Sequence, residues 1–353
     1  MASHNTDTTA APVAVPKVTK DPRFGAGRRL VVRGMAHEGA IDIFATLVEE
    51  TTQKYSPDDI EAAPVYYEYG NALLRAALSS QHQLEEDGDD DGDSGSKKNG
   101  IQNGDQKPAA KEEEKSKEQN EEGKESTYED IAEADTSEDM ALALEMMENA
   151  FAILQQEIEE TDDKQKKKYA DWGQEQLPRV LLGIGDTLSA LGRHADAADA
   201  YSRALEHFQS RLESEKQRPS DTNSKKVTIE QLKTHRKVAE ATILVAEELL
   251  ACPSGEDVVT TETQSMIVSA QERIEYAKGY YDKARDALQE TVLVMGELAA
   301  RSSNDGEWKQ EKEDVCFLAT MVMGVGETLA AIEEEHLDAA SSPEPVKKKA
   351  KSH

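Results

Sequence analysis

One short sequence pattern recurs four times along the chain and constrains its fold more than any other feature. It consists of an apolar residue, Gly or Ala, a polar residue, any residue and Leu. It occupies residues 69–73 (YGNAL), 184–188 (IGDTL), 245–249 (VAEEL) and 325–329 (VGETL). Its first and last positions are four apart and share one face of a helix, and the small residue lets a second helix approach closely. The repetition predicts an array of packed helices.

A second pattern follows the first three occurrences: Ala, a large apolar residue four positions later, and Ala three positions after that. It is found at Ala143/Met147/Ala150, Ala197/Tyr201/Ala204 and Ala277/Tyr281/Ala284, with a degenerate form at Ala40/Phe44/Leu47. Between residues 181 and 204 the two patterns have the spacing of a tetratricopeptide repeat, with Gly192 at the turn. The same two patterns are 70 positions apart, from Leu73 to Ala143, in the preceding repeat, which therefore contains a long insertion.

We therefore predict an all-α, tetratricopeptide-repeat solenoid of four repeats and no strands. The last pattern has no partner helix and predicts a C-terminal capping helix. The insertion in the second repeat has almost no apolar residues, so it cannot offset the entropy of ordering and is predicted to be disordered. The predicted segments are a disordered N-terminus (1–25), the first repeat with the first helix of the second (26–81), the acidic insertion (82–137), the remaining repeats (138–302), the capping helix (303–338) and a basic disordered tail (339–353).

The formal charge of the chain is −30, and residues 82–139 contain 21 Asp and Glu against 7 Lys and Arg. The acidity also extends over the rest of the body. Such a field attracts basic partners and repels nucleic acid and anionic lipid. We therefore expect no direct contact with nucleic acid. The sequence contains no uninterrupted apolar run of eighteen residues, so it predicts no membrane span.

No pattern in the sequence points to catalysis, a cofactor or a metal. Two cysteines are too few for a disulfide framework, which favours a reducing compartment, and the eight histidines have no metal-ligand spacing. The pairs Gly183/Gly185 and Gly324/Gly326 lack the Lys-Ser/Thr of a phosphate-binding loop. We expect a protein that is not an enzyme.

In this arrangement the chain resembles the nuclear autoantigenic sperm protein family, a group of histone chaperones with interrupted tetratricopeptide repeats. The resemblance covers about residues 26–337 and the basic tail, and rests on four repeats, an acidic insertion from Gln81 to Ser137 and a long capping helix. It implies binding of core histones H3 and H4, H3 in particular, and their escort to nucleosome assembly. It also implies other histone chaperones or acetyltransferase complexes as partners, and residence in the nucleus with some cytoplasmic escort.

Two acidic surfaces are candidates for histone binding. The first is the insertion, whose carboxylates can neutralise histone Lys and Arg through many salt-screened contacts. Its candidate residues are Glu85, Glu86, Asp87, Asp89, Asp90, Asp91, Asp93, Glu112, Glu113 and Glu114. The second is the concave groove of the repeat family. In that family the residue after each small Gly or Ala tends to face the groove. The groove candidates are Asn71, Asp186, Glu247 and Glu327, with Tyr67, Leu182, Ile243 and Met323 one turn earlier. An acidic and apolar groove suits an amphipathic basic segment.

The C-terminal tail contains a short basic cluster after two prolines. Lys347, Lys348, Lys349 and Lys351 resemble a nuclear-import signal, which an import receptor would read.

Two other functions remain open. A tetratricopeptide co-chaperone that grips the acidic C-terminus of a heat-shock chaperone would need Lys, Arg and Asn in the groove, where Asp186, Glu247 and Glu327 would repel that ligand. The other function is an acidic scaffold that brings other proteins together.

Overall fold

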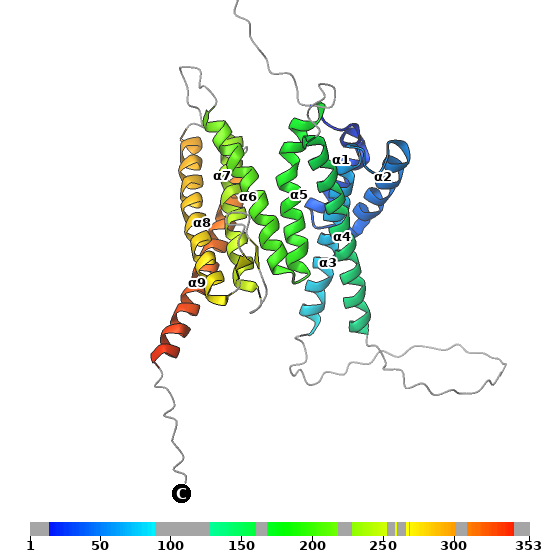
Figure 1. Cartoon of the computed structure of the whole chain (residues 1–353). Helices are drawn as coiled ribbons and strands as arrows, with labels where there is room; N and C mark the ends of the chain where they lie inside the picture. The colour runs from blue at the N-terminus through cyan, green and yellow to red at the C-terminus, as the bar shows by residue number, and fades with distance from the viewer. Residues whose placement is uncertain are drawn as a thin grey trace, which may run out of the picture.

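The computed structural model describes residues 14–88, 128–159, 168–217, 228–252, 258–259, 266–267, 269–300 and 309–341. Over these residues the chain is almost entirely helical (Figure 1). The α-helices are α1 (Pro22–Val32), α2 (Ile41–Lys54), α3 (Ala63–Gly88), α4 (Tyr128–Glu159), α5 (Ala170–Ala190), α6 (His194–Gln217), α7 (Ile229–Ala251), α8 (Ala270–Ala299) and α9 (Lys309–Ser341). A 3-10 turn, η1 (Lys17–Lys20), precedes α1, and a π-helical turn, η2 (Ala36–Ala40), precedes α2.

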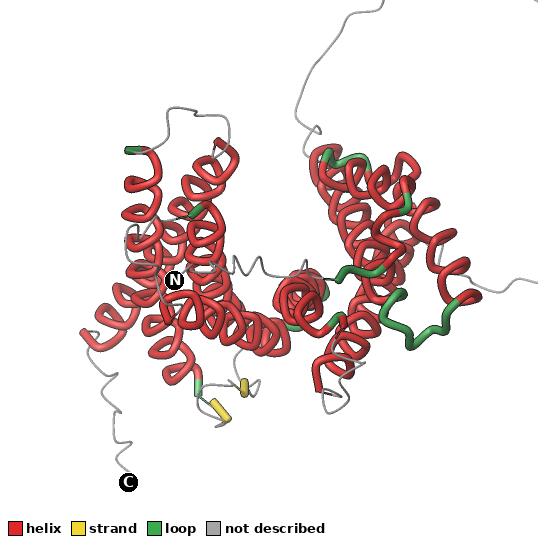
Figure 2. The backbone as a smooth tube through the Cα atoms, turned by 90° about the horizontal axis from the view of Figure 1, so that it is seen from above, coloured by secondary structure: helices red, strands yellow, loops and turns green. Residues whose placement is uncertain are grey.

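From α3 onward each helix packs against the next one in the sequence, and α9 contacts both α8 and α7. Viewed from above, the helices follow a curved path (Figure 2). Packing between sequence neighbours is the arrangement of a helical solenoid, in which each unit buries its apolar face against the next. The structure therefore confirms the predicted all-helical class at this level.

The helix boundaries have local causes that can be read from the residues. Asp21 accepts a hydrogen bond from the backbone N–H of Arg23, and Pro22 occupies the first turn of α1. Capping boxes start α7, with Thr228 and Gln231, and α8, with Ser269 and Glu272.

The turn between α5 and α6 depends on a glycine. Gly192 has φ +71°, a left-handed conformation that costs glycine little and other residues more. It lets α6 reverse direction within three residues of the end of α5.

Helix pairs close where a small residue meets a large side chain. A Cβ atom placed on Gly185 of α5 would lie 2.6 Å from Cδ1 of Tyr201 in α6, so only glycine allows this approach. A Cβ on Gly70 of α3 would lie 2.7 Å from the carbonyl oxygen of Ala143 in α4. One apolar core runs from the start of α3 to α9.

The N-terminal helices form a second, smaller core. Phe24 of α1 packs edge-on against Phe44 of α2, with ring centroids 5.9 Å apart. Both rings are buried beside Val65 and Ala72 of α3, so α1 and α2 cover the open end of the array.

Three features differ from the sequence prediction. The boundary predicted at residue 25 falls inside α1, because the helical turns already begin at Lys17. The predicted insertion starts inside α3 and ends inside α4, and its residues 89–127 lie outside the described part of the chain. A short antiparallel pair, β1 (Val258–Val259) and β2 (Met266–Ile267), stands between α7 and α8, where no strand was predicted.

Candidate functional site

The predicted groove residues come from α3, α5, α7 and α9, the first helix of each successive pair and the last helix. The structure places them at very different depths. Glu247, Glu327 and Met323 are exposed, with Met323 60% accessible, whereas Tyr67, Asn71 and Asp186 are half-buried. Leu182 and Ile243 are buried in the core, so these two side chains stabilise packing and offer no surface to a partner.

Asp186 is engaged within its own helix pair. The hydroxyl of Tyr201 in α6 donates a hydrogen bond of 2.9 Å to its Oδ1 atom. Burial raises the pKa of the Asp186 carboxyl, and the hydrogen bond from Tyr201 opposes that rise. Asp186 therefore contributes a partly desolvated carboxylate that is tied to the closure of α5 on α6.

The charge around Asp186 is mixed. Arg75 of α3 and Lys237 of α7 both act on it electrostatically, as does Glu240 of α7 with the opposite sign. The repeat pattern indicates the acidic residues of the predicted groove and not these two cations. Arg75 lies one turn after Asn71 on α3, a spacing that could have revealed it, whereas Lys237 lies six residues before Ile243 on α7.

A second carboxylate cluster stands at the other end of α7. Burial raises the pKa of the Glu247 carboxyl, and the neighbouring Glu248 adds to that rise. Glu248 is buried, and one of its oxygens lies 2.8 Å from Nδ1 of His194 at the start of α6. Glu247 remains exposed and is the carboxylate of this pair that a partner can reach.

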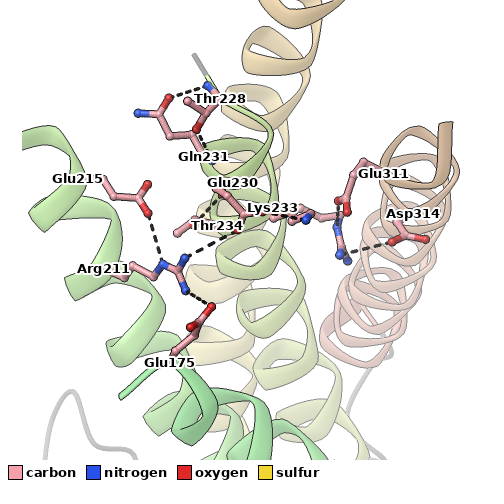
Figure 3. Close-up of polar contacts among 11 residues, drawn as sticks. Glu175, Arg211, Glu215, Thr228, Glu230, Gln231, Lys233, Thr234, Glu311 and Asp314 are labelled. Atoms are coloured by element: carbon pink, nitrogen blue, oxygen red, sulfur yellow. Dashed lines mark hydrogen bonds and ion pairs between the residues drawn. The ribbon is translucent and has the colours of Figure 1, made fainter. Parts of the chain in front are cut away.

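Two arginines gather carboxylates from several helices (Figure 3). Arg211 of α6 lies between Glu175 of α5, Glu215 of its own helix and Glu230 of α7, at 3.9, 3.3 and 3.9 Å. The second oxygen of Glu215 is buried with no hydrogen-bond partner among the described residues. Three carboxylates around one guanidinium leave this junction acidic, even with Lys233 paired to Glu230 at 2.9 Å.

The other arginine, Arg236 of α7, anchors the last helix. Its guanidinium lies 3.0 Å from Glu311 and 3.4 Å from Asp314, both in α9, and 3.0 Å from Glu240 (Figure 3 draws the contacts with α9). Arg236 and Glu311 are only 14% and 11% exposed. Because the pair is largely desolvated, removing Arg236 would leave the Glu311 carboxylate without a compensating charge.

The remaining predicted residues cannot be placed as surfaces. Glu85, Glu86 and Asp87 fall in the last turns of α3, and their side chains lie outside the described set. The other insertion candidates and the basic tail from Lys347 to Lys351 also lie outside the described residues. Within the part of the chain that is described, no group of three or more His, Cys, Asp or Glu could hold a metal ion.

The last helix, α9, contains a long apolar stretch. The stretch Gln310–Ile332 is long and apolar enough to cross a membrane, with mean hydropathy 1.9 and 28% of its most apolar window buried. Its buried apolar residues are Val315, Leu318, Val322, Val325 and Leu329. They repeat every three or four positions, as on a helix that covers one side of a core. Length and composition alone are weak evidence for a span.

Searches against known proteins add no family assignment. No protein-family model matches the chain, and no curated protein matches it either.

Proposed function

We propose that the chain is a nuclear histone chaperone that binds the core histones H3 and H4 and escorts them to nucleosome assembly. The observation that carries the proposal is the placement of the acidic insertion. α3 and α4 pack together as a pair although residues 89–127 separate them in the sequence. A helical array interrupted by an acidic segment inside one pair is the feature on which the family resemblance rests.

The charge of the chain supports a basic partner. A formal charge of −30 attracts Lys- and Arg-rich proteins over distances set by the ionic strength. Exposed carboxylates on the helices, such as Glu247 and Glu327, would contact the basic side chains of the partner at fixed positions on the array. The two surfaces have separate roles in the proposal: the insertion accelerates encounter, and the fixed carboxylates slow dissociation.

The structure changes how the groove is best tested. Reversing Asp186 would break its hydrogen bond with Tyr201 and disturb α5–α6 closure, so a loss of binding could not be attributed to the groove. The sharper variant carries Glu247→Lys and Glu327→Lys, because both side chains are exposed. Its matched control carries Glu145→Lys and Glu148→Lys, which make the same charge change on exposed positions of α4.

The measurement is surface-based kinetics with a purified H3–H4 pair at two salt concentrations. We expect the groove double variant to dissociate roughly tenfold faster and the α4 control to stay within about threefold of the parent. Neutralising the carboxylates from Glu85 to Asp93 should slow association and flatten its salt dependence. Absence of histone binding by the parent chain would refute the proposal and leave the two alternative functions. Binding of an acidic C-terminal peptide would then favour the co-chaperone over the acidic scaffold.

A further inference from the structure

A cavity of about 270 Å³ opens between α1, α3 and α5, and Tyr67, one of the predicted groove residues, contributes to its wall. One part of its wall is apolar and well packed. Phe24, Leu154, Trp172 and Val180 contribute to it, and each is at most 7% exposed. Because these side chains are held by the surrounding core, the cavity is preformed and its shape does not depend on an occupant.

The other part of the wall contains two arginines that share one carboxylate. Nε of Arg28 lies 2.9 Å from Oε1 of Glu68, and Nη2 of Arg179 lies 3.1 Å from the same oxygen. Glu68 is only 5% exposed at its side chain, whereas Arg28 and Arg179 are 44% and 40% exposed. Two positive charges against one negative charge leave the wall cationic.

Arg179 is held in place by a second contact. Its Nε donates a hydrogen bond of 3.3 Å to the Tyr67 hydroxyl, and its guanidinium carbon lies 4.9 Å from the centroid of that ring. Burial opposes the charged form of Arg179, but Tyr67 and Glu68 outweigh it and leave its pKa raised. Within the described residues, Glu68 is the carboxylate paired with both guanidiniums, and no hydrogen bond engages the Nη1 atom of Arg179 or either Nη atom of Arg28. These donors are free to bind an anion.

The chemistry of both walls limits the occupant. A guanidinium pair binds carboxylate and phosphate, but a phosphate would leave the apolar wall uncovered. A polyanion would be repelled by a chain with a net charge of −30. One carboxylate joined to an apolar side chain satisfies both walls, and a cavity of this size holds a few side-chain groups at most.

We propose that this cavity binds a peptide segment that carries a single Glu or Asp side chain next to a large apolar side chain. Arg28 and Arg179 would receive the carboxylate, and the wall around Phe24 and Trp172 would receive the apolar group. The proposal stands independently of histone binding, since it concerns an anionic feature of a partner and not a basic one.

Trp172 supplies the reporter for the test. The sequence contains two tryptophans, so the full chain with Trp308→Phe retains Trp172 alone. The probe is an acetylated and amidated peptide of sequence Gly-Leu-Glu-Phe-Gly, titrated while Trp172 fluorescence is recorded. We expect saturable binding, and about tenfold weaker binding of the peptide with Gln in place of Glu.

Three variants distinguish binding from folding. Arg28→Gln and Arg179→Gln should each weaken the Glu peptide about tenfold and bring it level with the Gln peptide. Glu68→Gln should strengthen the Glu peptide, because it removes the competing carboxylate and retains an acceptor oxygen; general destabilisation would have the opposite effect. Arg203→Gln is the control, since Arg203 stacks on Phe151 at 4.7 Å as Arg179 stacks on Tyr67.

Several outcomes would overturn the proposal. Equal binding of the Glu and Gln peptides would mean that only the apolar wall is used. A stronger response to inorganic phosphate than to the peptide would assign the arginines to phosphate. Tighter binding of the Gln peptide when it ends in a free carboxylate would assign them to a chain terminus. The absence of any Trp172 response would leave the cavity without a peptide ligand.

Discussion

The middle of the array and its C-terminal end are closed in different ways. Between α5 and α6, Gly185 lies directly against the ring of Tyr201, which is 2% exposed. Between α8 and α9, Gly326 lies against the hydroxyl end of Tyr281, a half-buried side chain, and a Cβ atom on Gly326 would lie 2.7 Å from that hydroxyl oxygen and 3.1 Å from the ring carbon that bears it. The end of the array is held in addition by the ion pairs of Arg236 with Glu311 and Asp314.

The close packing of a glycine against a tyrosine ring thus sets the interior junction, whereas the last junction combines a similar contact at the rim of a tyrosine with ion pairs. An interior pair is enclosed by neighbours on both sides, so a small residue against a large one is enough to set the distance between its helices. The last helix has a partner on one side only, and Phe317, on its other side, is 68% exposed. An apolar stripe gives α9 its affinity for the array, and the ion pairs give it a register.

The largest expected effect concerns the interior pair. Gly185→Leu should lower the free energy of unfolding by about 3 kcal/mol, because no atom of the new side chain fits between α5 and the Tyr201 ring. Thermal unfolding followed by circular dichroism measures it. Adding Tyr201→Ala should restore part of the loss by opening space for Leu. An unchanged melting midpoint in the single variant would show that Gly185 does not set the helix distance.

The second effect concerns the end of the array. Arg236→Gln should cost about 2 kcal/mol, because it leaves Glu311 with an uncompensated charge in a mostly buried position. The loss should be local. Hydrogen exchange should accelerate in α9 and stay unchanged in α5 and α6. Equal acceleration in all three helices would mean that the end and the interior unfold as one unit.

A smaller effect tests whether the ionised carboxylate of Asp186, on the α5–α6 pair, lowers the free energy of unfolding. Burial raises the folded-state pKa of Asp186 above its ordinary 3.8, so the ionised form destabilises the fold at neutral pH. Asp186→Asn should therefore raise the melting midpoint at pH 7, and the gain should shrink as the pH falls through the folded-state pKa and vanish below 3.8. A gain that persists at the lowest pH would assign it to packing. Glu145→Gln, at an exposed position of α4, should have no such effect.

The smallest effect is a gain in stability, at a glycine that touches nothing. A Cβ atom on Gly279 of α8 would meet no atom within 4 Å. Gly279→Ala should therefore stabilise the chain by about 0.5–1 kcal/mol through helix propensity alone. A loss of stability at Gly279 would contradict the view that only the glycines at helix contacts are required.

Much of the fold could be predicted from the sequence, because local spacing determines which residues share a helix face. The closure of Gly185 on Tyr201 follows from residues sixteen positions apart with a glycine turn between them. The N-terminal boundary could not be placed this way, because α1 contains RFGAGRR and has weak apolar periodicity. Its helix is stabilised by the contact of Phe24 with Phe44, which is tertiary.

The candidate site was less predictable, because it depends on which helices meet. Leu182 and Ile243 have the spacing of groove residues, yet both are enclosed by neighbouring helices that local spacing does not identify. The contact of Arg179 with Glu68 joins positions 111 residues apart, and Arg28 reaches the same carboxylate from a third helix. No pattern within a single repeat indicates such a cluster.

The interrupted pair α3–α4 also bears on the order in which the chain folds. The ends of α5 and α6 are separated by three residues, 191–193, whereas α3 and α4 are separated by residues 89–127. The entropic cost of bringing two helices together rises by about 0.6 kcal/mol for each doubling of the connection. We therefore expect the α5–α6 hairpin to form before α3 packs against α4. Since side chains and not the connection hold α3 to α4, a chain cut between residues 89 and 127 should reassemble from its two fragments.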